Sequence, residues 1–116
     1  MNLSKMSIND KRLLDCLEHI RDNKQLQTLN LSHNKITSAG LKELLKVVSK
    51  HPSLEILYLN NNYLDETAIK MLKKNSGKLG KIRYIGLRNN RGIGNVEKFR
   101  DVVGQMKKMK IRLDVK

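Results

Sequence analysis

The sequence predicts a single α/β domain, a right-handed solenoid in which about five short parallel strands alternate with four helices. Two observations predict this fold: a repeat of apolar residues and asparagines every 28 residues, and an apolar pattern at helical spacing inside each repeat. The length of 116 residues supports one domain, because it allows one modest core. We place the repeats at about 1–25, 26–53, 54–81 and 82–110, followed by a terminal strand at 111–116.

The first half of each repeat carries the strand. In the pattern Leu-x-x-Leu-x-Leu-x-x-Asn-x-Ile, which starts at Leu26, alternate apolar residues point to one face of a short strand and the residues between them point to the other. The pattern starts again at Leu54 and at Ile82, where its last apolar residue is displaced to Ile93. One period earlier, residues 1–8 predict a degenerate first copy.

An asparagine closes each complete pattern, at the point where the chain turns away from the strand. Its side-chain amide can hydrogen-bond the exposed backbone of the turn and of the neighbouring coil. Stacked copies therefore predict a structural ladder of Asn34, Asn62 and Asn90. Met6 takes the equivalent position in the first copy, as expected for a terminal coil.

The second half of each repeat is helical. Apolar residues at i, i+3, i+4 and i+7 start at Leu13 and again at Leu41. In the third helix Lys73 and Ser76 occupy two positions that should be apolar, and in the fourth a stripe from Phe99 is shifted by two residues. The predicted N-caps are Asn9, Ser38 and Asp65.

The best copy of the repeat, residues 26–54, adds Gly40-Leu41-x-x-x-Leu45 and Pro52-x-Leu54 to the strand pattern. It resembles the ribonuclease-inhibitor-like class of leucine-rich repeats, which includes tropomodulin-like actin regulators and NOD-like receptor sensors. The resemblance implies a horseshoe segment that binds proteins on its concave strand face and its loops, mostly inside cells. A few leucine-rich repeat domains, such as those of messenger-RNA export receptors, join RNA-binding surfaces.

The outward-facing strand residues form the predicted protein-binding surface. The period places Tyr58 beside Gly86, Tyr84 beside Ile56, and Arg88 next to Asn60. Tyrosine and arginine are enriched in binding hot spots. The alternative interpretation is that the two tyrosines only pack across strands and stabilise the sheet. The predicted surface consists of Asn30, Ile56, Tyr58, Asn60, Tyr84, Arg88, Arg112 and Lys116.

The net charge of +13 is concentrated in the second half of the chain. Residues 1–66 hold 9 Lys/Arg against 8 Asp/Glu, whereas residues 67–116 hold 15 against 3. A solvated helix face is the ordinary explanation, but such a field also attracts nucleic acid, acidic protein tails or anionic lipid. With few aromatic residues, RNA binding would rest on phosphate contacts. The candidate anion-binding residues are Lys70, Lys74, Lys78, Lys81, Arg100, Lys107 and Lys108.

The sequence offers no catalytic or metal-ligating constellation. His19, His33 and His51 fall on different elements, and the lone Cys16 lies on an apolar stripe. We therefore predict a non-catalytic scaffold without metal or cofactor that binds another protein, with RNA or ribonucleoprotein binding as the alternative. The strand edges predict that the chain either packs edge-on against a partner in a larger assembly or is a segment of a longer protein. One cysteine and the lack of a signal segment or an apolar span predict a cytoplasmic or nuclear protein.

Overall fold

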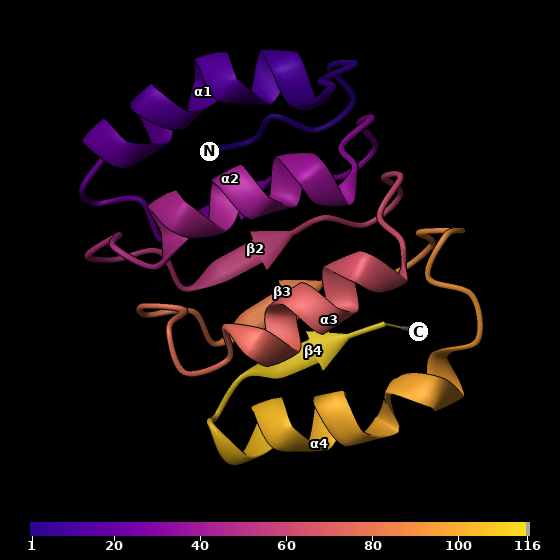
Figure 1. Cartoon of the computed structure of the whole chain (residues 1–116). Coiled ribbons are helices and arrows are strands. Elements are labelled where there is room, and N and C mark those ends of the chain that lie inside the picture. Colours follow the sequence, from indigo (N-terminus) through magenta and orange to yellow (C-terminus); the bar gives the residue numbers. More distant parts are fainter. Residues whose placement is uncertain (116) are drawn as a thin grey trace.

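A computed structural model describes residues 1–115, and in it helices and parallel strands alternate along the chain (Figure 1). The elements are α1 (Asp10–Asp22), β1 (Thr28–Asn30), α2 (Ser38–Val48), β2 (Ile56–Tyr58), α3 (Glu66–Lys74), β3 (Tyr84–Gly86), the 3-10 turn η1 (Val96–Phe99), α4 (Arg100–Lys108) and β4 (Arg112–Asp114). The strands form one parallel sheet in the order β1-β2-β3-β4. Each strand therefore pairs with the next one in the sequence, as a solenoid requires.

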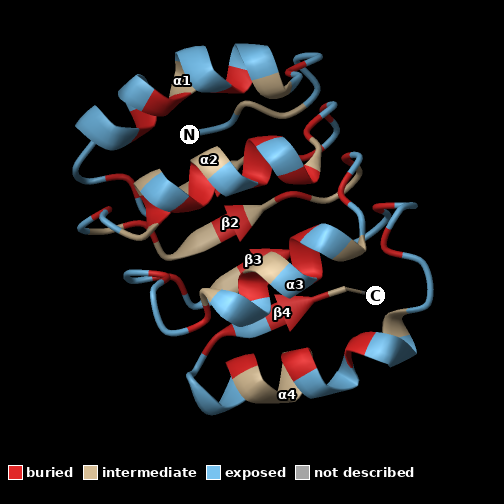
Figure 2. Cartoon of the chain, viewed as in Figure 1, coloured by how far each residue is buried: buried red, intermediate tan, exposed pale blue. Residues whose placement is uncertain are grey.

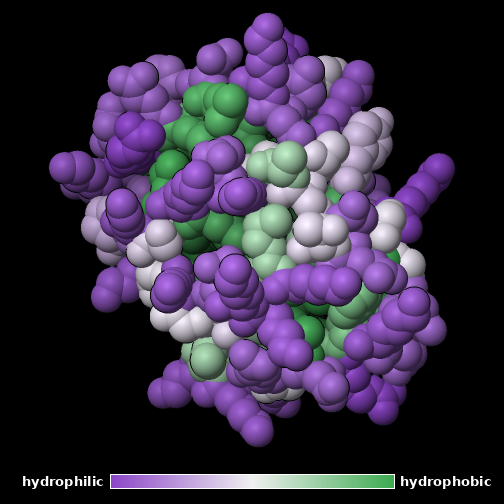
Figure 3. All heavy atoms as spheres, in the orientation of Figure 1, coloured by the Kyte–Doolittle hydropathy of each residue, from purple (hydrophilic) through white to green (hydrophobic). Residues whose placement is uncertain are grey.

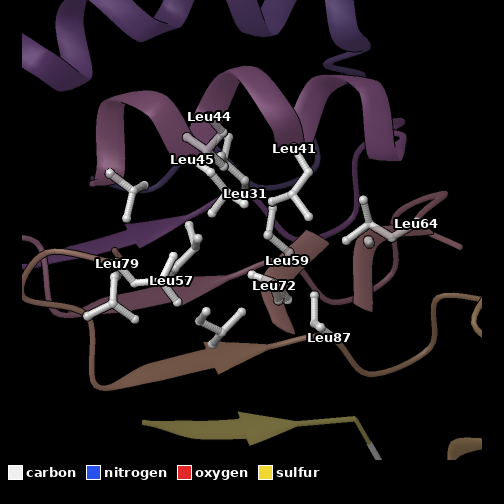
Figure 4. Packing of buried hydrophobic residues seen from close by; sticks show 14 of the residues in the cluster. Leu31, Leu41, Leu44, Leu45, Leu57, Leu59, Leu64, Leu72, Leu79 and Leu87 are labelled. Atoms are coloured by element: carbon white, nitrogen blue, oxygen red, sulfur yellow. The ribbon is translucent and has the colours of Figure 1, made fainter. Parts of the chain in front are cut away.

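The strand register follows the 28-residue period. Leu29 pairs with Leu57, Leu57 with Ile85, and Ile85 with Leu113. These four side chains are 4% exposed or less, and the helices cover one face of the sheet (Figure 2). Figure 4 shows leucines of α2 meeting those of the strands in this layer. The predicted fold class is confirmed, and the opposite face of the sheet, which we call the open face, carries none of the helices formed by residues 1–115.

The fifth strand predicted for the first repeat is reduced to a single bridge. Asn2 pairs with Asn30 in parallel, and the Leu3 amide donates to the Asn30 carbonyl at 2.8 Å. Lys5 and Ser7 then take left-handed backbone conformations, with φ of 57° and 53°. Because the chain turns away so soon after Asn2, the described residues contain four strands instead of five.

The helix N-caps agree with the sequence at two of three positions. The side chains of Asn9 and Asp65 accept hydrogen bonds from the amides of the first turn. The prediction of Ser38 is wrong, because Thr37 caps α2 through the Ala39 amide. Ser38 is the first helical residue, and its hydroxyl instead donates to Asp65 of the next coil at 2.7 Å.

Lys73 and Ser76, the two polar residues at predicted apolar positions of the third helix, lie in different environments. Lys73 is exposed, so it leaves the core. Ser76 follows the end of α3 and is buried, with its hydroxyl accepting a hydrogen bond from the Gln105 side-chain amide at 3.0 Å. This contact joins the third coil to α4 and satisfies a polar atom that would otherwise be costly to bury.

The asparagine ladder joins consecutive coils. The Oδ1 atom of Asn62 accepts from the Ile36 amide at 3.0 Å, and its Nδ2 donates to the Leu31 carbonyl at 2.9 Å. Asn34 and Asn90 bond the coil before them in the same way, and all three side chains are buried. The residue before each asparagine has φ between 57° and 59°. These repeated turns hold the strand ends level, which fixes the rows of side chains on the open face.

Candidate functional site

The strand register gathers the predicted protein-binding residues into rows on the open face. Ile56 pairs with Tyr84, and Tyr84 pairs with Arg112. In the next row Tyr58 pairs with Gly86, and Gly86 with Asp114. We call the side chains of Ile56, Tyr58, Tyr84, Arg88, Arg112 and Asp114 the open-face cluster.

Tyr84 lies at the centre of the open-face cluster. Its ring centroid is 5.5 Å from that of Tyr58, with the rings tilted by 57°, which is a favourable geometry for an aromatic pair. The Arg112 guanidinium, which comes from the neighbouring strand β4, lies over the Tyr84 ring, 5.7 Å from its centroid and at cation–π distance. The two tyrosines therefore do pack across strands, and in doing so they hold one ring in a fixed orientation.

Asp114 fixes the polar end of Tyr84. The Tyr84 hydroxyl donates to Oδ2 of Asp114 at 2.7 Å, and the Nε of Arg88 donates to both carboxylate oxygens at 2.9 and 3.0 Å. Asp114 is only 8% exposed, so the carboxylate depends on these two donors for solvation. Because only the Nε of Arg88 bonds Asp114, the terminal nitrogens of the Arg88 guanidinium remain available to a partner, and the Arg88 side chain is 51% exposed.

Hydrogen bonding also sets the charge state of this network. Partial burial acts to raise the pKa of Asp114, but the hydrogen bonds from Arg88 and Tyr84 outweigh it and hold that pKa below its ordinary value. The pKa of Tyr84 is raised, first by burial and then by its hydrogen bond to Asp114. Near neutral pH the network therefore consists of a carboxylate, a neutral phenol and two guanidinium ions.

We expect the stabilising effect of Asp114 to depend on pH. A carboxyl with a lowered pKa in the folded state stabilises the protein above its unfolded pKa of about 3.9 and loses that effect as the pH falls through the folded value. The Asp114→Asn variant should therefore differ most from the wild type at neutral pH. Urea unfolding should show the difference shrinking as the pH falls below about 4. A difference that stays constant over this range would contradict the assignment.

Gly86 provides the space next to Tyr84. A Cβ atom there would lie 2.9 Å from Oδ1 of Asn60 and 3.3 Å from Cε1 of Tyr84. That Asn60 oxygen accepts a hydrogen bond from the Arg88 amide at 2.8 Å. The absence of a side chain at Gly86 thus lets the side chains of Tyr84 and Asn60 both occupy the space beside its Cα atom.

The other predicted residues lie at the margins of the open-face cluster. Asn30 of β1 pairs with Tyr58 of β2, and the Asn30 side chain accepts a hydrogen bond from the Ser32 amide at 3.0 Å. Lys116 lies outside the described residues. Asp114 is the residue that sequence reasoning left out of the site, although strand alternation places it on the open face. The 28-residue period places Asp114 opposite Gly86 and near Tyr84 and Arg88, and this position could have identified it as part of the site.

The candidate anion-binding residues do not form one surface. Lys70, Lys74 and Lys78 line a groove of about 610 Å³ between α2 and α3, together with Lys42 and Lys46 from the less basic half. Figure 3 shows hydrophilic side chains over most of this side of the molecule, with hydrophobic residues visible between them.

The remaining candidates are scattered. Lys107 lines a separate hollow beside β4, and Arg100 forms an ion pair with Glu97 at another. Lys81 and Lys108 are exposed and line none of these three hollows.

Comparison with known proteins identifies the repeats. Residues 24–74, which include β1, α2, β2 and α3, match the family model described as Leucine Rich repeats (2 copies). No curated protein matches the chain. Among residues 1–115, no helix combines the length and apolar character needed to cross a membrane, and no group of His, Cys, Asp and Glu could hold a metal ion. The matched segment and the single parallel sheet identify the fold as an α/β solenoid of leucine-rich repeats.

Proposed function

We propose that the protein binds another protein through the open-face cluster. Leucine-rich repeat domains generally mediate protein–protein interaction and are typically non-catalytic scaffolds. The observation that carries the proposal is the fixed orientation of Tyr84, held between Tyr58 and Arg112 and hydrogen-bonded to Asp114. A side chain that is already ordered loses little conformational entropy on binding, so more of its contact energy appears as affinity.

The composition of the cluster supports a protein partner. Two tyrosines supply rigid apolar area, Ile56 adds a half-exposed aliphatic contact, and Arg88 and Arg112 supply donors for carboxylates or carbonyls. Both tyrosines take part in packing, so the sheet-stabilising interpretation and the binding interpretation describe the same contacts. A base-stacking site would need aromatic faces open to solvent, whereas Tyr84 is half-buried, with the Tyr58 ring centroid 5.5 Å and the Arg112 guanidinium 5.7 Å from the centroid of its ring.

We also infer that the repeats belong to the ribonuclease-inhibitor-like class and that the protein acts in the cytoplasm or nucleus. The 28-residue period leaves room for a true α-helix in each coil, and the helices are 9 to 13 residues long. Cys16, a free thiol packed against the core, fits a reducing compartment.

Site-specific photocrosslinking in lysate of cells that express the protein tests the binding surface. A photoreactive amino acid at Ile56 or Arg112 should capture a discrete protein, whereas the same group at Glu18, on the exposed side of α1, should not. Nuclease treatment before irradiation separates the two function classes. Capture that survives nuclease supports a direct protein partner, and capture that disappears would favour the RNA or ribonucleoprotein alternative.

A second contact is proposed at the edge of the sheet. Among the described strands β4 pairs with β3 alone, and hollows of about 440 and 390 Å³ lie beside it, both lined by Arg112 and Leu113. An edge strand with such a border favours edge-on packing against a partner protein. Hydrogen exchange should show the Leu113 amide weakly protected in the isolated chain and protected in the complex. Equal protection in both would count against edge packing.

A further inference from the structure

The groove between α2 and α3 combines five lysines on the helical side of the sheet, away from the open-face cluster. All five are exposed: Lys42, Lys46, Lys70, Lys74 and Lys78. No carboxylate is among the residues that line the groove, all of which are described. Two acids on these helices form ion pairs: Glu43 contacts Lys46 at 3.2 Å, and Glu66 contacts Lys98, outside the groove, at 3.5 Å.

The repeat itself sets the arrangement of these lysines. Lys42 and Lys46 are four residues apart on α2, and Lys70 and Lys74 occupy the same positions one 28-residue period later on α3. Like charges at this spacing repel each other and destabilise a helix. Two such pairs on adjacent helices therefore oppose folding, and they concentrate positive potential over one groove.

The apolar part of the groove lining, which we call its floor, consists of Leu45 and Met71, and the uncharged polar residues Ser49, Thr67 and Asn75 complete the lining. Leu45 is 5% exposed and packs in the core, while Met71 is half-buried and remains in contact with solvent. A methionine can adapt its shape to different apolar side chains. A nucleic acid backbone has no group that would use this floor, and no aromatic residue lines the groove to stack on a base. The lining therefore matches an anionic partner that also carries apolar side chains.

We propose that the α2–α3 groove binds a short acidic segment of a partner protein in which Glu or Asp residues accompany apolar ones. The lysines attract the carboxylates, and the apolar side chains contact Met71 and the edge of Leu45. The groove follows α3, whose 9 residues span about 14 Å, so it accommodates about ten residues of a bound helix. The proposal concerns a surface distinct from the open-face cluster and stands independently of the function proposed above.

Fluorescence anisotropy with the full chain tests the proposal. The probe is a labelled peptide of about twelve residues in which the unit Glu-Glu-Leu-Leu is repeated, called the Glu/Leu peptide. The two control probes are an all-glutamate peptide and a single-stranded RNA with the same net charge as the Glu/Leu peptide. We expect the Glu/Leu peptide to bind more tightly than either control probe at the same salt concentration. Tighter binding of the RNA would overturn the proposal in favour of a nucleic acid site.

Matched charge reversals locate the binding site. The double variant Lys70→Glu/Lys74→Glu should weaken peptide binding by at least about 30-fold. The control variant Lys81→Glu/Lys108→Glu changes the net charge by the same amount, but at residues outside the groove. It should weaken peptide binding by less than about 3-fold. All four side chains are exposed, so both variants should keep the wild-type circular dichroism spectrum. Equal losses in the two variants would show a general field effect and overturn the proposal.

A third variant tests the apolar floor separately from charge. Met71→Gln should weaken the Glu/Leu peptide about 5-fold while leaving the all-glutamate peptide unchanged, because only the former places apolar atoms on the floor. An unchanged affinity for the Glu/Leu peptide would overturn the assignment of an apolar contact. These variants leave the open-face cluster intact, so photocrosslinking from Ile56 should be unaffected whichever result is obtained.

Discussion

Replacing Asn62 with leucine is expected to lower the free energy of unfolding by about 2–4 kcal/mol. The side chain is 3% exposed, and the substitution removes the acceptor of the Ile36 amide and the donor to the Leu31 carbonyl. The Ile36 amide then has no acceptor, which costs about 1–3 kcal/mol, whereas the Leu31 carbonyl loses one of two donors and keeps Nδ2 of Asn34 at 3.0 Å. Urea unfolding followed by circular dichroism measures the loss, which is a large fraction of the 5–15 kcal/mol typical of domains.

The adjacent residue provides the control for this prediction. Asn61 lies on the same turn with φ of 57°, a conformation that glycine adopts without strain. Asn61→Gly should therefore change the free energy of unfolding by no more than about 0.5 kcal/mol. A loss below about 1 kcal/mol for Asn62→Leu would mean that the asparagine ladder does not hold the coils together.

Replacing Gly86 with valine is expected to weaken partner binding by more than about 10-fold and to lower stability by about 1–3 kcal/mol. The first added carbon would meet Oδ1 of Asn60 at 2.9 Å and Cε1 of Tyr84 at 3.3 Å. To relieve these contacts Tyr84 has to move, which disturbs its packing on Tyr58 and its hydrogen bond to Asp114. Binding is measured by the yield of the photocrosslink from Arg112, and stability by urea unfolding.

Gly104 offers a matched substitution elsewhere. It lies within α4, and a Cβ atom there would meet nothing within 4 Å. Gly104→Ala should leave binding unchanged and raise stability by about 0.5–1 kcal/mol, because alanine favours the helix. If Gly86→Val binds the partner as well as Gly104→Ala does, the orientation of Tyr84 has no role in recognition.

The strands and their register could be predicted because one period governs both. Leu29, Leu57 and Ile85 are equivalent in the repeat, so their alignment in the sheet follows from their spacing. The first strand was over-predicted, since the apolar pattern of residues 1–8 does not reveal the left-handed turns at Lys5 and Ser7. The α2 cap was misplaced by one residue because serine is favoured over threonine at this position, although the 28-residue period that relates Asn9 to Asp65 indicates Thr37.

The open face could be predicted from strand alternation, but the pairing within it could not. Parity indicates that Tyr84, Arg88 and Asp114 share a face, yet the hydrogen bonds that join them depend on side-chain rotamers. The basic residues show the same limit. Charge counting groups Lys70 with Lys107 because both belong to the basic half, whereas the helix orientation places Lys70 in the α2–α3 groove and Lys107 beside β4.

Nuclear magnetic resonance titration of the protein with the partner captured from Ile56 tests the binding surface most directly. We predict that the perturbed amide signals will cluster on β2, β3 and β4, around Tyr58, Tyr84 and Arg112, while the exposed side of α1 stays unchanged. Perturbations confined to the helices, with the three strands unaffected, would contradict the assignment of the open-face cluster as the binding site.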